Sequence, residues 1–134
     1  MTVAPSSPAL AHSAALRAPA DPNRIGPLAR KWAVLHRAAG IVTLLAGLEA
    51  EPRHIEVRRF PAAIRDTGGW RRDLAEQGVS DLAAIMEPGL AALLSLHARG
   101  APTQAPARAL WGEFTRARAG LLALLPPTQA ASAA

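Results

Sequence analysis

The residues best suited to chemistry gather between residues 53 and 72. Six arginines stand there against two acids, Glu56 and Asp66. A pair of glycines, Gly68 and Gly69, precedes Trp70 at the start of a predicted helix. A helix N-terminus attracts anions through its free N–H groups, and a guanidinium makes bidentate contacts with carboxylate or phosphate. We expect a contact surface for an acidic partner protein, formed by Arg58, Arg59, Arg65, Trp70, Arg71 and Arg72.

Two other interpretations of this region stay open. The arginines could form an ordinary solvated face, with Trp70 packed inward. They could also bind nucleic acid, although no basic recognition helix stands out and the net charge of +5 is modest. Arg53 belongs to the same gathering and follows Pro52, which favours the start of a short helix.

The distribution of charge also favours an anionic partner. Residues 24–72 contain ten basic side chains against four acids, whereas residues 73–125 contain four against five. Such asymmetry is typical of proteins that bind an anionic partner. A GC-rich genome is the alternative explanation, because it also favours arginine and alanine, and the chain has 32 Ala.

Signals for catalysis and for metal binding are weak. The chain has no Cys, which excludes a thiolate nucleophile and a cysteine metal site. Glu51 and His54 have the Glu-x-x-His spacing of di-iron bundles, but such a site needs a second pair and two further carboxylates. We therefore expect Glu51 and His54 to have a surface or capping role.

The remaining titratable residues give no catalytic set. His36 and His97 lie beside apolar stripes, where a histidine is usually a hydrogen-bonded boundary residue. Asp73 and Glu76 share one face of a short predicted helix and are expected to be solvated. No phosphate loop or dinucleotide fingerprint is present. The sequence thus predicts a protein that is not an enzyme, with no catalytic residues, no cofactor and no metal.

Apolar residues recur at three- and four-residue steps, which predicts an all-α fold. We expect a small single-domain helical bundle of three main helices plus two or three short helices. The main helices are predicted from Pro27 to about Leu48, from Ser80 to Arg99 and from Thr103 to Leu125. The short helices are predicted at about 52–59, 61–67 and 70–77, with Gly68 as a C-cap.

The predicted helix from Ser80 to Arg99 is expected to be central to the bundle. Its N-cap is Ser80, and Pro88 is expected to kink or split it. Six large apolar residues form one stripe, and a row of alanines lies opposite: Leu82, Ile85, Met86, Leu90, Leu93 and Leu94 in the stripe, and Ala84, Ala91 and Ala98 in the row. We expect both sides to be in contact with other helices, and the alanine side to allow close backbone approach.

The second half of the first main helix is apolar on the side that its first half exposes to solvent. That side carries Ile41, Leu44, Leu45 and Leu48. Burial within the same chain is the simpler expectation, and exposure for a partner is the alternative.

The chain divides into three parts. We expect a flexible arm at residues 1–23, a helical bundle domain at 24–126 and a disordered tail at 127–134. No uncharged apolar run in the bundle reaches the length of about 18 residues that a membrane span needs. The sequence therefore predicts a cytoplasmic interaction module, an adaptor, accessory subunit or regulator, with no membrane partner. A homo-oligomer stays open.

Overall fold

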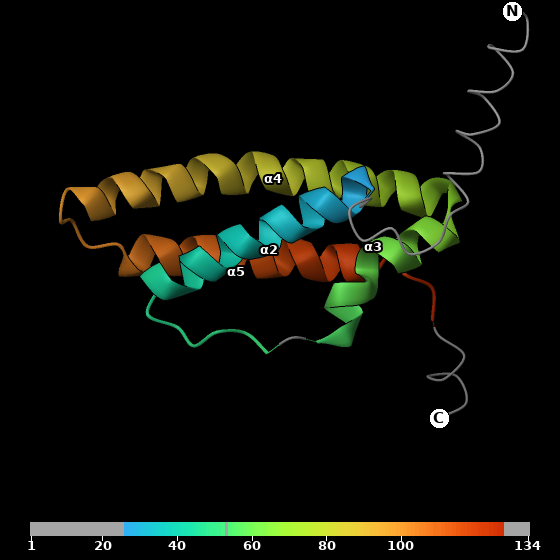
Figure 1. Cartoon of the computed structure of the whole chain (residues 1–134), viewed down its shortest axis with the longest axis horizontal. Helices are drawn as coiled ribbons and strands as arrows, with labels where there is room; N and C mark the ends of the chain where they lie inside the picture. The colour runs from blue at the N-terminus through green and yellow to red at the C-terminus, as the bar shows by residue number, and fades with distance from the viewer. Residues whose placement is uncertain (1–25, 53, 128–134) are drawn as a thin grey trace, which may run out of the picture.

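The structure is a computed structural model that describes residues 26–52 and 54–127. This part of the chain contains four helices and no strand, which confirms the all-α class. The helices are α2 (Pro27–Leu45), α3 (Ile55–Thr67), α4 (Gly69–Ala98) and α5 (Gln104–Leu122) (Figure 1). The predicted arm at residues 1–23 lies outside the described residues, and so does the predicted tail at 127–134 except for Pro127.

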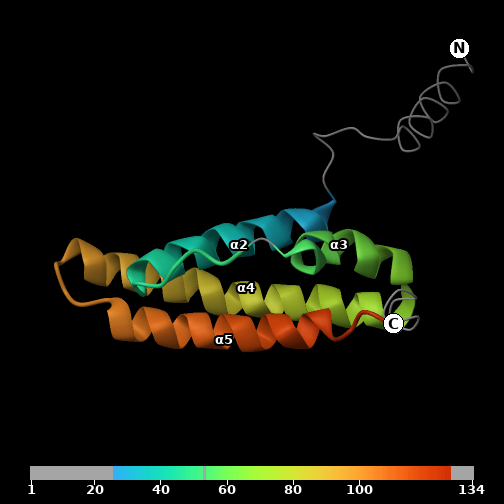
Figure 2. The ribbon, with the colours of Figure 1, turned by 90° about the horizontal axis from the view of Figure 1, so that it is seen from below.

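Three long helices lie side by side, and α3 covers one end of them (Figures 1 and 2). Helices α2 and α4 run in the same direction, and Lys31 Nζ on α2 donates to Ser80 Oγ on α4 across 3.2 Å. Helix α5 runs in the opposite direction. Residues 46–52 return along the bundle without forming a helix, and α3 lies beside the start of α2.

The three- and four-residue spacing of apolar residues gives α2 a buried stripe. Trp32, Leu35, Ala39 and Val42 are buried on α2, and the stripe continues to Ala46 just beyond the helix. The other helices complete the core with Phe60 and Ile64 from α3, Ala75, Val79, Leu82, Met86 and Leu93 from α4, and Ala107, Leu110, Phe114 and Leu121 from α5. Burial of these side chains is the main favourable contribution to folding.

Helix α4 contradicts the predicted boundaries because it continues through Gly78, Ser80 and Pro88. Pro88 lies on the solvent side, and buried Met86 and Leu93 fix the helix before and after it. Gly78 does not end a helix; it lies so close to α5 that a Cβ would come within 2.5 Å of Leu121 Cδ2. Ser80 is therefore an interior residue and not an N-cap.

The alanine row of α4 was expected to be a packed face, and this expectation is wrong. Ala84, Ala91 and Ala98 are exposed. Close approach is provided by glycines on another face, where a Cβ on Gly89 would come within 2.8 Å of Leu110 Cδ2 on α5. The stripe is only partly buried too, since Ile85 and Leu94 are 43% and 45% exposed.

Residues 55–67 form one helix rather than two short ones. Pro61 lies inside α3, one residue after the predicted junction at Phe60. The buried side chains of Phe60 and Ile64 hold this helix against the bundle. Gly68 is confirmed as its C-cap: it has φ 66°, and its N–H donates to the Ile64 carbonyl.

The simpler expectation for the second half of the first helix fails at two positions. Leu44 is 76% exposed and Ile41 is 39% exposed, whereas Leu45 and Leu48 are partly buried. This part of α2 therefore presents apolar side chains to solvent.

Helix α4 is also the one helix in the described ranges that is long and apolar enough to cross a membrane. Its most apolar 18-residue window has a mean hydropathy of 1.5, and 22% of that window is buried. Length and composition alone are weak evidence, because core helices of soluble proteins pass the same test.

Candidate functional site

Trp70 lies in the first turn of α4 and is 62% exposed, so the interpretation in which it packs inward is wrong. Its neighbour Arg71 places its guanidinium 4.9 Å from the centre of the indole ring. This cation–π contact holds the two side chains together on the surface.

Three of the predicted arginines come together at one end of the bundle. Arg58, Arg65 and Arg72 line a hollow of about 370 Å³ between α3, the start of α2 and the first turns of α4. Arg59 is exposed on α3 but does not line this hollow. Together with Trp70 and Arg71 these residues form what we call the basic surface, and Arg53 lies outside the described residues.

The arginines of the basic surface have no acidic partner among the described residues. The one ion pair that this part of the structure shows joins Arg118 and Glu51, which lie elsewhere. Glu76 lines the same hollow as Arg72 without forming an ion pair. The N–H of Gly68 is already used to end α3. The guanidiniums of the basic surface are therefore available to donate to a partner.

A second charged group was missed by the sequence analysis. Arg118 on α5 is only 7% exposed, and its guanidinium donates to both carboxylate oxygens of Glu51, with Nη1 2.7 Å from Oε1. Arg118 Nη1 also lies 3.2 Å from His36 Nε2. We call Glu51, Arg118 and His36 the inner charge cluster. It could have been suspected, because Arg118 lies one turn from Phe114 and Leu121 within an apolar stripe.

Two hydrogen bonds determine the tautomer of the His36 imidazole. Its Nδ1 lies 2.9 Å from the carbonyl oxygen of Trp32 and must donate to it, so Nε2 accepts from Arg118. Burial lowers the pKa of His36, the Trp32 carbonyl opposes this effect, and the charge of Arg118 adds to it. The neutral imidazole is therefore the form that fits, and His36 is the hydrogen-bonded boundary residue that we expected.

The pairing with Arg118 also shifts the pKa of Glu51. The hydrogen bonds from Arg118 lower the pKa of this carboxyl group below its ordinary value, against the opposing effect of burial. Glu51 thus holds the segment that follows α2, residues 46–52, against α5, a role that neither the capping nor the metal interpretation described. His54 is exposed and forms the N-cap position of α3, without a side-chain capping bond.

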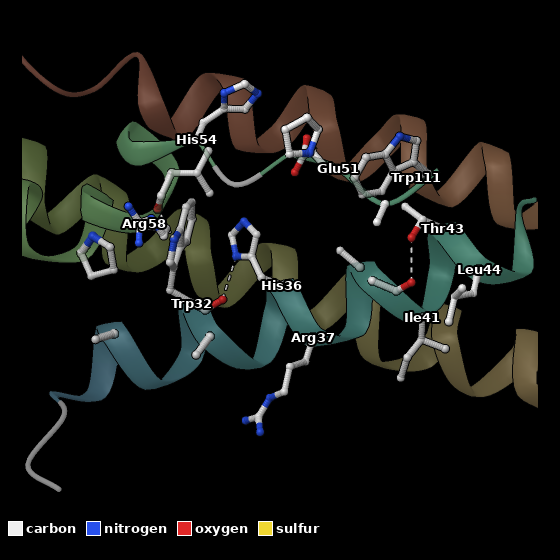
Figure 3. A pocket seen from close by; sticks show the side chains of 18 residues that line it. Trp32, His36, Arg37, Ile41, Thr43, Leu44, Glu51, His54, Arg58 and Trp111 are labelled. Carbon is white, nitrogen blue, oxygen red and sulfur yellow. Dashed lines mark hydrogen bonds between the residues drawn. The ribbon is translucent and has the colours of Figure 1, made fainter. Parts of the chain in front are cut away.

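The inner charge cluster lies at a groove of about 830 Å³ between α2 and two segments opposite it, residues 50–52 and 54–58 (Figure 3). Trp32 and His36 point into this space from α2, and Trp111 of α5 borders it on the other side. Most of its lining is apolar. Pockets of this size and character often bind small molecules.

The known proteins give no guide to either site. Comparisons with protein-family models, with curated proteins and with solved structures gave no match.

Proposed function

We propose that this protein is a small helical interaction module whose basic surface binds an acidic surface of another protein. It would act as an adaptor, accessory subunit or regulator rather than as an enzyme. The observation that supports this proposal is that the five described arginines of the basic surface have no ion-pair partner, and that one of them, Arg71, lies over the ring of an exposed tryptophan. Tryptophan and arginine are enriched among the residues that contribute most to binding energy at interfaces.

The test compares two double variants that remove the same charge. Arg71→Ala with Arg72→Ala should abolish or strongly weaken capture of an acidic partner from nuclease-treated lysate of the source cells, and should lower the affinity for that partner once it is purified. Arg99→Ala with Arg116→Ala is the matched control, because both side chains are exposed and lie outside the basic surface. Melting curves should be nearly unchanged for both variants.

Three results would count against the proposal. Equal affinity of the two double variants would show that Arg71 and Arg72 are not significant contacts. A lowered melting temperature of the first variant alone would assign the guanidiniums a structural role. Binding that nuclease abolishes and that weakens steeply with salt would favour nucleic acid as the partner, since phosphate contacts release counterions.

A further inference from the structure

Four of the polar side chains that line the groove beside α2 already have hydrogen-bond partners. Trp32 Nε1 donates to the Val57 carbonyl over 2.7 Å, and Thr43 Oγ1 donates to the Gly40 carbonyl over 2.7 Å. His36 and Glu51 are bonded to Arg118, as described above. These side chains have no free donor to offer to an occupant. An occupant that brings few polar groups of its own therefore fits this groove best.

The groove is long, and one of its ends is basic. Its lining follows α2 from Ala29 to Leu44, which corresponds to about 22 Å at 1.5 Å per residue. Ala29, Arg58 and Pro61 line both the groove and the smaller hollow that contains Arg65 and Arg72. The apolar groove thus opens at this end onto the hollow of Arg58, Arg65 and Arg72, while Arg37, which also belongs to its lining, points away from Trp32 and His36 in Figure 3.

From this combination we infer that the groove binds a linear anionic amphiphile of the fatty-acid class. The hydrocarbon chain lies along α2, past Trp32 and His36 towards Leu44, and the carboxylate lies at Arg58. This binding site shares Arg58 with the basic surface, but it does not use Trp70 or Arg71 and does not depend on their contact with a partner protein.

Other occupants fit less well. An extended peptide would bring backbone N–H and C=O groups that find few partners in this lining, and each unpaired group opposes binding. A cationic amphiphile would place its charge beside Arg58, Arg65 and Arg72. A neutral chain would leave these guanidiniums without an anion.

The chain offers a variant that fills the groove without disturbing the core. Gly40 lines the groove, and a Cβ built there meets no atom within 4 Å. Gly40→Leu should therefore occupy the groove while preserving α2, because leucine favours helix more than glycine does. Gly120→Leu is the matched control: Gly120 is exposed on α5, does not line the groove, and has the same free space.

Laurate is the probe, titrated into the full chain by isothermal calorimetry at concentrations where it is monomeric. Wild type and Gly120→Leu should bind one laurate with equal affinity, and Gly40→Leu should weaken binding by about tenfold or more. Arg58→Gln should weaken binding roughly fivefold, the effect of one exposed ion pair, while its neighbour Arg59→Gln should leave it unchanged. Dodecyltrimethylammonium and dodecanol should bind more weakly than laurate.

Several outcomes would overturn the inference. One is the absence of laurate binding to the wild type. Another is equal binding of laurate and dodecyltrimethylammonium, which would remove the role of Arg58. A third is equal laurate affinity of Gly40→Leu and wild type, which would place the hydrocarbon elsewhere, such as on the exposed apolar face of α4. None of these results depends on Arg71 and Arg72, so failure here is distinguishable from failure of the proposed function.

Discussion

The inner charge cluster and the basic surface use arginine in opposite ways. Arg118 is buried and donates to Glu51 and His36, so its charge is matched within the fold. Arg71 and Arg72, at the start of α4, have no acidic partner in the described part of the chain. A buried guanidinium needs a partner because water no longer solvates it, whereas an exposed one does not. In the inner charge cluster the arginine thus joins two segments of the fold, whereas on the basic surface the arginines are available for a partner.

The largest expected effect comes from breaking the inner charge cluster. Arg118→Met should lower the free energy of unfolding by about 2–3 kcal/mol, somewhat below the roughly 3–5 kcal/mol of fully buried pairs, because Glu51 retains some access to water. The control is Arg116→Met, an exposed position on the same helix, which should change stability by less than about 0.5 kcal/mol. Urea unfolding measures both, and similar values for the two variants would erase the distinction between the regions.

A smaller effect is expected from pH. Because burial lowers the pKa of His36 below its ordinary value of 6.5, the unfolded chain takes up this proton first, and stability should decrease as the pH falls below that value. Glu51, whose pKa is lowered by Arg118, stabilises the fold above its ordinary value of 4.5 and loses this contribution as the pH falls through its folded-state pKa.

Unfolding measured across this range tests the assignment to His36. One proton contributes at most about 1.4 kcal/mol per pH unit to the slope. His36→Gln keeps an acceptor for Arg118 but cannot titrate, so it should flatten the decline just below pH 6.5. An identical slope in this variant would show that His36 is not the group responsible.

The smallest expected effect is on the basic surface. Trp70→Ala should change the free energy of unfolding by no more than about 0.5 kcal/mol, because its side chain is 62% exposed. The variant also loses its most exposed tryptophan and keeps Trp32, which is only 5% exposed. Acrylamide should therefore quench a smaller fraction of its tryptophan emission than in the wild type. A large loss of stability would show that Trp70 braces the bundle and would weaken the contrast between the two regions.

Local patterns predicted the parts of the fold that depend on neighbouring residues. The spacing of apolar residues identified the buried stripe of α2 and the helical class, and Gly68 was identified as a C-cap because glycine readily adopts a positive φ. Local rules failed where packing against another helix opposes them. Gly78 and Pro88 look like breaks in the sequence, yet core contacts on both sides keep α4 continuous.

The candidate sites were predictable only in part. The residues of the basic surface stand out because they are close in sequence, but the exposure of Trp70 depends on how α4 packs. The inner charge cluster joins Glu51 to Arg118, 67 residues further along the chain, so no spacing rule could pair them. The groove depends on the path of residues 46–52, which carry no periodic pattern.

The parallel arrangement of α2 and α4 has a consequence for the order in which the chain folds. Helices α4 and α5 form a local hairpin, with Gly89 lying close to Leu110, whereas the contact of His36 with Arg118 spans 82 residues. Contacts between residues that are close in sequence need less loop closure, so the folding nucleus should lie in the hairpin and α2 should dock late. Substitutions such as Leu110→Ala should then slow folding, while Leu35→Ala should mainly accelerate unfolding, a difference that φ-values measure.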